Sequence, residues 1–172
     1  VTQEIIAYEQ TRITNKIEKT LVYPNGVLLD SKFFSDNRSE IPEILFVASY
    51  FFEWHGLDLL LSNLKKTDKK FILHVVGNVE QADKELAIND KRVIFHGQLT
   101  KREINDLAKK CCVGLSSFAL YRKSMHEACT LKVREYLSLG LPVYSGHRDI
   151  FPEDFSYYKN GARETGVYNS QF

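Results

Sequence analysis

Short apolar runs alternate with amphipathic segments along most of the chain. Residues 44–48 form a continuous apolar run with β-branched members, which is typical of a strand buried on both faces of a sheet. Leucines at positions 57, 60, 61 and 64 then share one stripe of a helix predicted over about 57–66. The same alternation predicts strands at 71–76, 92–95, 113–116 and 143–145, and helices at about 81–88, 101–109 and 131–139.

This order of elements predicts an α/β fold, with a doubly wound, Rossmann-like parallel sheet between layers of helices. Right-handed crossovers bring the carboxyl ends of the strands to one edge, where such sheets bind ligands. The loops expected at this edge begin at Ser49, Gly77, Gly97 and Ser116. After Asp149 the pattern weakens, although the aromatic segment 151–158 predicts a short helix and residues 159–161 predict a turn.

The most specific stretch of the sequence is 127–145, where a polar loop leads into a helix and then into a short strand. Gly140 can adopt the left-handed conformation that ends a helix, and Pro142 prevents the helix from continuing. The apolar positions of this helix are Leu131, Val133, Tyr136, Leu137 and Leu139.

Two carboxylates, Glu127 in the loop and Glu135 in the helix, are separated by seven residues and flank the helix N-terminus. Unpaired N–H groups of a first helical turn attract phosphate. A carboxylate one turn further along can accept hydrogen bonds from the two hydroxyls of a ribose. The pattern therefore suggests a nucleotide-sugar site, although two glutamates at this spacing are also common as solvent-facing helix residues.

The residues around these two carboxylates favour the nucleotide-sugar site. The segment R-K-S-M-H-E-A-C-T-L-K-V-R-E-Y-L-S-L-G-L-P-V resembles the donor-binding segment of retaining GT-B glycosyltransferases of the family 4 (group 1) type. The resemblance extends from about residue 23, where Y-P-N-G-V is similar to the entry into the carboxy-terminal domain, to residue 145. It implies that Glu135 binds the ribose and that Glu127, the catalytic residue, faces the transferred sugar. It also implies that backbone amides of Thr130, Leu131 and Lys132 hold the diphosphate.

The chain departs from the family pattern in the loop after the first strand. Relatives commonly carry an arginine and a lysine there, whereas this loop has no arginine and places His55 before Gly56. His55 can donate a hydrogen bond to phosphate or be an ordinary packing residue. Arg122, Lys123 and Lys132 are expected to supply the missing positive charge, and the alternative for Arg122 and Lys123 is a solvated basic loop.

Composition narrows the possible partners and cofactors. With 172 residues, 44% of them hydrophobic, the chain suits one well-buried domain, and a net charge of +1 argues against nucleic acid as a partner. Three cysteines form neither a disulfide framework nor a metal set and indicate reduced thiols, hence a cytoplasmic protein. The histidines lack ligand spacing and no Asp-x-Asp occurs, so no metal and no cofactor beyond the substrate, a UDP- or GDP-type sugar, is expected.

Taken together, these features predict the donor-binding half of a GT-B glycosyltransferase. Residues 1–22 are expected to be the tail of a missing amino-terminal acceptor domain or a linker, and 23–172 the nucleotide-sugar-binding domain. The full-length enzyme would transfer a sugar with retention, in polysaccharide or glycoconjugate biosynthesis, a role compatible with peripheral association at the cytosolic membrane face. This chain alone would bind donor without turnover. One alternative is a catalytically inactive nucleotide-binding or assembly module. A dinucleotide-dependent oxidoreductase is disfavoured because no G-x-G-x-x-G follows the first strand.

Overall fold

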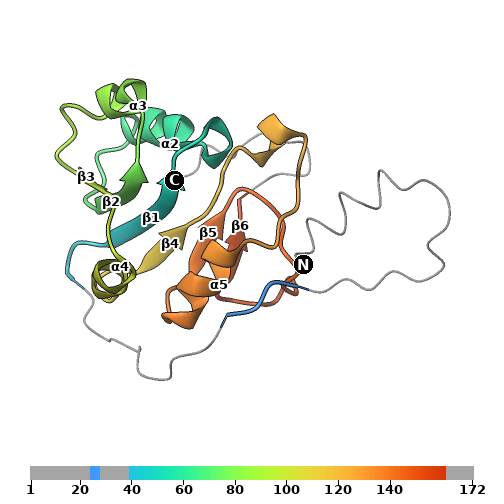
Figure 1. Cartoon of the computed structure of the whole chain (residues 1–172). Coiled ribbons are helices and arrows are strands. Elements are labelled where there is room, and N and C mark those ends of the chain that lie inside the picture. The colour runs from blue at the N-terminus through green and yellow to red at the C-terminus, as the bar shows by residue number, and fades with distance from the viewer. Residues whose placement is uncertain (1–23, 28–38, 162–172) are drawn as a thin grey trace, which may run out of the picture.

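A parallel sheet organises the part of the chain that the computed structural model describes, residues 24–27 and 39–161. Its strands lie in the order β3-β2-β1-β4-β5-β6, so that β1 is central (Figure 1). The strands are β1 (Glu43–Tyr50), β2 (Ile72–Asn78), β3 (Val93–Gly97), β4 (Val113–Leu115), β5 (Val143–Ser145) and β6 (Tyr158–Asn160). The helices are η1 (Glu53–His55), α2 (Leu57–Leu64), α3 (Gln81–Leu86), α4 (Lys101–Ala108), η2 (Leu120–Lys123) and α5 (Leu131–Ser138).

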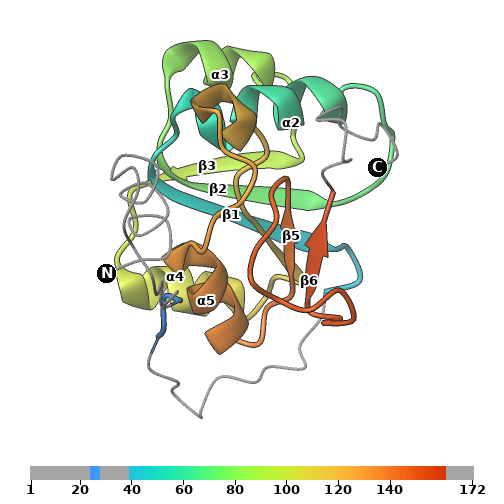
Figure 2. The ribbon, with the colours of Figure 1, turned by 90° about the vertical axis from the view of Figure 1, so that its right-hand side faces the viewer.

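Helices cover both faces of this sheet. Figure 2 shows α2 and α3 on one side of the strands and α4 and α5 on the other. Two apolar clusters fill the spaces between these layers, one that includes Leu57 and Leu61 of α2 and one that includes Ala108 of α4 and Val133 of α5. The doubly wound, Rossmann-like α/β fold predicted from the sequence is confirmed.

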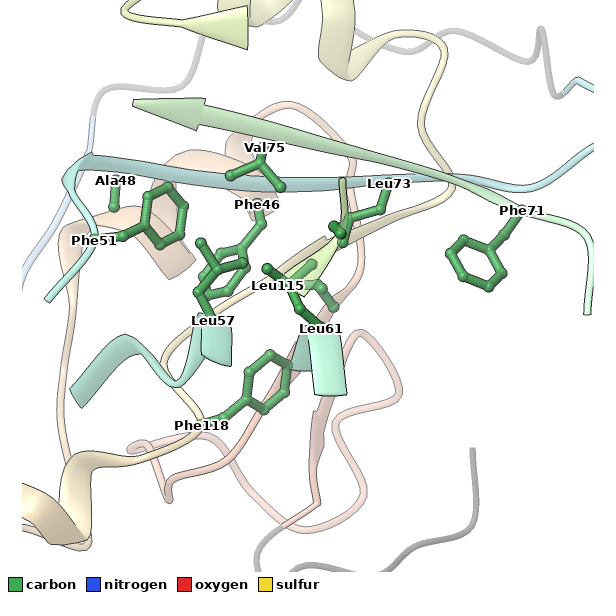
Figure 3. Packing of buried hydrophobic residues seen from close by; sticks show 11 residues of the cluster. Phe46, Ala48, Phe51, Leu57, Leu61, Phe71, Leu73, Val75, Leu115 and Phe118 are labelled. Carbon is green, nitrogen blue, oxygen red and sulfur yellow. The ribbon is translucent and has the colours of Figure 1, made fainter. Parts of the chain in front are cut away.

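The core under α2 is built around Phe46 of β1. Its ring packs edge-on against Phe51, with centroids 4.9 Å apart, and against Phe118, at 5.8 Å. Figure 3 shows these rings together with Leu57 and Leu61 between strand and helix. Phe51 directly follows β1 and Phe118 lies three residues after the end of β4, so this core fixes the loops at the carboxyl ends of both strands.

On the opposite face, α5 is tied to the central strand by Tyr136. The buried Tyr136 hydroxyl accepts a hydrogen bond of 2.8 Å from the backbone N–H of Val47 in β1. Its ring lies over Gly114 of β4, where an added Cβ would come within 2.6 Å of the ring. Glycine at 114 therefore allows α5 to approach the sheet closely.

Two predictions for the C-terminal part are wrong. Residues 151–157 form bends and turns instead of the predicted helix, and residue 158 begins β6, which also contains residues 159 and 160, predicted as turn. Pairing with β5, in which Val143 lies opposite Tyr158, stabilises this extended conformation. The predicted tail at 1–22 lies outside the described residues.

Candidate functional site

Three loops meet at the carboxyl edge of the sheet, as parallel topology requires. The loop after β4 is joined to η1, because the N–H groups of Phe118 and Ala119 donate to the carbonyls of His55 and Trp54, at 3.0 and 3.2 Å. The loop after β5 is joined in turn to the loop after β4, because the N–H of Gly146 donates to the carbonyl of Ser117 at 3.0 Å. These backbone bonds hold the loops as one surface beside the N-terminus of α5.

His55 and Gly56 occupy the η1 side of this surface. The Phe52 N–H donates to His55 Nδ1 at 3.0 Å, so the neutral ring carries its proton on Nε2, the nitrogen that can donate to a ligand. Burial, together with the charge of Lys132, lowers the pKa of His55 to about 4, and the ring is therefore neutral at physiological pH. Gly56 has φ of 70°, and an added Cβ would lie 2.9 Å from that of Phe118, so glycine is required there.

The N-terminus of α5 is uncapped by side chains. Thr130 is the N-cap, yet its hydroxyl accepts no capping bond, and the first turn contains no acidic residue. Leu131 is 52% exposed. Lys132, in contrast, has its ammonium buried 5.2 Å from the centroid of the Phe46 ring. The first N–H groups of α5 and the buried ammonium of Lys132 therefore both lie at the start of this helix.

Several buried polar atoms at this edge make no hydrogen bond. In the described part of the chain, the buried side-chain N and O atoms without a partner are Lys132 Nζ, Thr130 Oγ1, Ser116 Oγ and His147 Nε2. All four residues lie at the carboxyl ends of β4 and β5 or at the start of α5. Since unpaired buried polar groups are costly, their grouping indicates a site for a polar ligand.

Among these groups, Lys132 carries a charge that its burial disfavours. Burial lowers its pKa to about 7, and the nearby carboxylate of Glu135 partly opposes this shift. Its charge also acts on His147, whose pKa is lowered chiefly by burial. An anion beside the ammonium would restore its charge.

The two predicted carboxylates are both accessible. Glu135 is exposed one helical turn after Lys132. Glu127 lies opposite Arg148 in a short parallel bridge, and their side chains, 69% and 67% exposed, approach to 3.4 Å. The structure thus brings Glu135, Thr130, Leu131 and Lys132 to one helix end and leaves Glu127 on the loop beside it.

Comparison with models of known protein families shows which family the chain belongs to. The model of a family described as glycosyl transferases group 1 matches residues 41–161. The chain belongs to this family. A comparison with curated protein sequences gives no significant match.

Solved structures support the same fold for this group 1 glycosyltransferase chain. It is similar to a lipopolysaccharide outer core galactosyltransferase, WaaB, in its apo form, with a TM-score of 0.63 and 19% identity over 93% of this chain. It is also similar to TarM, with a TM-score of 0.55 and 16% identity over 79% of this chain. The chain spans 45% of the WaaB chain and 28% of the TarM chain. Among the described residues, no helix has the length and apolar character needed to cross a membrane.

The basic pair of this group 1 glycosyltransferase already has protein partners. Arg122 makes a bidentate contact with Asp58 of α2, at 2.9 and 2.8 Å, and donates to the carbonyl of Glu53 at 2.7 Å. The exposed Lys123 has its ammonium 4.5 Å from the centroid of the Trp54 ring. Both residues therefore connect η2 to the segment around η1, and contact with a diphosphate stays a prediction for them.

A double-mutant cycle tests the structural contact of Arg122. We expect Arg122→Ala and Asp58→Ala each to lower the free energy of unfolding, with a coupling energy of about 1 kcal/mol, because the pair is bidentate and partly shielded. Urea unfolding of the two single variants and the double variant measures it. Additive effects would mean that the two side chains do not interact in solution.

Three groups of the candidate site do not follow from the sequence. Ser116 was recognised as the start of a loop, but its buried hydroxyl was not foreseen. His147 Nδ1 lies 2.7 Å from Ser145 Oγ and 3.1 Å from the Ser117 carbonyl, which holds the ring in place. Asp149 pairs with Arg134 of α5. A motif search carries no signal for these groups, because their burial and the contacts of His147 with Ser117 and of Asp149 with Arg134 join separate segments of the fold.

Proposed function

We propose that residues 23–172 form the donor-binding domain of a retaining GT-B glycosyltransferase of the family 4 type, which binds a nucleotide-diphosphate sugar at the N-terminus of α5. The observation that carries this proposal is the buried ammonium of Lys132, which has no hydrogen-bond partner at the start of that helix. A buried, unpaired cation is costly, and an anionic ligand would offset that cost.

A diphosphate matches the other groups at this helix end. The uncapped N–H groups of the first turn favour negative charge through both hydrogen bonds and the helix dipole. Thr130 Oγ1 and Ser116 Oγ can each donate to a phosphate oxygen. The neutral His55 can donate through Nε2. These donors would stabilise a diphosphate without a divalent cation.

The carboxylates fit the two sugars of such a donor. Glu135 is exposed one turn after Lys132, where a ribose attached to the bound phosphates would present its hydroxyls. Glu127, which is exposed in the loop preceding α5, would hydrogen-bond the transferred sugar.

The proposed chemistry is electrostatic stabilisation of the leaving group. When the bond between sugar and diphosphate breaks, negative charge develops on the terminal phosphate. The Lys132 ammonium and the N–H groups of α5 are already oriented, so they would stabilise that charge with little reorganisation. An acceptor would be bound by a further domain of a longer protein, in which transfer to a polysaccharide or another glycoconjugate would take place.

A non-catalytic nucleotide-binding module is the second candidate. Two observations favour it. Arg122 and Lys123 already contact Asp58 and Trp54, and the pKa of His55 is lowered to about 4, chiefly by burial. Less positive charge is then available for a leaving group than the sequence predicted. Such a module would bind the nucleotide but would not accelerate its release from the sugar.

Glu135→Gln tests the proposed ribose contact. We expect the variant to bind UDP or GDP roughly 10- to 100-fold more weakly, since hydrogen bonds to a charged acceptor contribute about 1.5–3 kcal/mol. Uridine or guanosine should lose a similar factor, because the ribose is common to nucleoside and nucleotide. Isothermal titration calorimetry on the whole chain measures these affinities.

The matched control is Glu85→Gln, which changes an exposed glutamate of α3. It should leave nucleotide affinity unchanged. Equal affinities of the parent and the Glu135→Gln variant for UDP and GDP would exclude the ribose contact. Binding of neither nucleotide by the parent chain would exclude the donor-binding function of this chain.

A further inference from the structure

A second cluster of potential ligands lies at the opposite edge of the sheet. Glu43 is the first residue of β1, His74 belongs to the adjacent β2, and Cys111 precedes β4, the neighbour of β1 on the other side. One ligand atom from each side chain lies within 4.8 Å of the other two. We propose that these three side chains bind a transition-metal ion, with zinc as the best match.

The backbone brings the three residues together by parallel pairing. His74 is the register partner of Leu45, which lies two residues after Glu43 and therefore on the same face of the sheet. The N–H of Cys112 donates to the carbonyl of Glu43 at 2.8 Å, which brings the segment before β4 to the start of β1. The convergence thus follows from rigid elements of the fold.

Hydrogen bonds already orient the imidazole as a ligand. His74 Nε2 lies 2.9 Å from Glu43 Oε2, and His74 Nδ1 lies 2.9 Å from His96 Nε2. A metal ion would replace the proton between His74 and Glu43, while His74 would keep a proton on Nδ1 and donate it to His96. A hydrogen bond from the second ring nitrogen is the usual support of a metal-bound histidine.

Burial explains why a cation would stabilise this cluster. The side chains of His74 and Glu43 are 8% and 14% exposed, and Cys111 is buried as well. Burial and the negative charge of Glu43 raise the pKa of Cys111 to about 12, so without a cation the thiol stays protonated. A bound metal would displace that proton and compensate the charge of both anionic ligands.

The donor set selects the class of metal. One thiolate, one imidazole and one carboxylate suit zinc, whereas magnesium and calcium prefer oxygen ligands alone. Zinc–nitrogen and zinc–sulfur bonds of about 2.0–2.3 Å bring ligand atoms to within roughly 4 Å of one another, so the cluster would contract slightly on binding. A water molecule would complete four coordination, because His96 Nε2 accepts the hydrogen bond from His74.

This site would be structural and separate from the donor site. Its three ligands connect β1, β2 and the segment before β4 at the amino end of the sheet, whereas nucleotide is proposed to bind at the carboxyl end. Zinc would therefore raise the stability of the domain without contacting the nucleotide. The two proposals can fail independently.

Metal titration of the whole chain, prepared without a polyhistidine tag and freed of metal, tests the site. We expect one equivalent of Zn²⁺ to bind and raise the melting temperature, and Co²⁺ to give a thiolate-to-cobalt charge-transfer band. Cys111→Ser should abolish that band and weaken zinc binding by at least tenfold. Cys112→Ser, which changes the neighbouring and less buried thiol, should bind both metals as the parent does.

His74→Gln provides a second variant in case Cys111→Ser does not fold, and it should lose zinc affinity by a similar factor while Cys112 remains unchanged. Absence of stoichiometric zinc binding by the parent chain would overturn the proposal. It would also be overturned by parent-like zinc affinity in both the Cys111→Ser and the His74→Gln variants, since the metal would then lie elsewhere.

Discussion

Lys132→Met is expected to weaken nucleoside-diphosphate binding strongly and at the same time to make the domain more stable. Loss of a charged hydrogen-bond donor to phosphate should cost about 2–3 kcal/mol, or roughly 30- to 150-fold in affinity for UDP or GDP. The nucleoside, which carries no phosphate, should lose much less. In the free protein the variant removes a buried ammonium that has no hydrogen-bond partner, which should add about 1–3 kcal/mol to the free energy of unfolding.

Both effects should depend on pH. Burial lowers the pKa of Lys132 to about 7 in the folded chain, whereas an unfolded lysine titrates near 10.4. The unfolded state therefore binds more protons between these values, and the cost of the buried ammonium is complete below pH 7 and disappears as pH approaches about 10. The stability gained by Lys132→Met should accordingly be largest at or below pH 7. Diphosphate affinity of the parent should fall above pH 7, because the free amine becomes neutral.

Calorimetry and urea unfolding at several pH values measure these two effects. Lys91→Met, at an exposed turn before β3, is the matched control and should change neither quantity appreciably. Unaltered UDP and GDP affinity in Lys132→Met would show that the ammonium does not contact the diphosphate. A destabilised variant would show that Lys132 has an internal partner in solution.

Asp149→Ala should cause the second large effect, a loss of about 3–5 kcal/mol in the free energy of unfolding. Arg134 of α5 contacts both carboxylate oxygens of Asp149, at 2.5 and 2.6 Å, and the two side chains are 8% and 0% exposed. Removal of the carboxylate would leave a buried guanidinium without its counter-charge. Urea unfolding measures the loss.

Asp106→Ala is the control for this second effect. Asp106 pairs with Lys109 on the exposed side of α4, where the side chains are 57% and 43% exposed, so its removal should leave the free energy of unfolding nearly unchanged. A similarly small change in Asp149→Ala would mean that water reaches Arg134. The ion pair would then not anchor the loop after β5 to α5.

Much of the fold could be predicted because its signals are local. The apolar run at 44–48 and the leucine stripe of α2 each lie within one element, and their burial follows from their spacing. Residues 151–158 were misread because aromatic content does not specify backbone conformation. Phe151 and Phe155 stack at 4.8 Å and Phe151 packs against Tyr158 at 5.2 Å, all without a helix.

The sequence predicts only those residues of the candidate site that lie within one short motif. Glu127, Glu135 and the helix N-terminus follow from short-range spacing. The burial of Lys132 does not, because it depends on Phe46, a residue of a strand far away in the sequence. The cluster of Glu43, His74 and Cys111 was not predicted for the same reason. Only sheet pairing brings these three residues together, so a search for metal ligands that are closely spaced in sequence cannot find them.

The hydrogen bond between Tyr136 and the Val47 amide limits how α5 can move. A helix held at one end by a loop could still rotate about its own axis, which would turn Lys132 away from the sheet and Glu135 towards a different side. The Tyr136 hydroxyl prevents this rotation because it is fixed to the central strand and sits one residue after Glu135. In the proposed donor-binding role, a bound nucleotide would therefore meet α5 and the sheet as one rigid body, and any movement of the site would have to be absorbed by the segments around it.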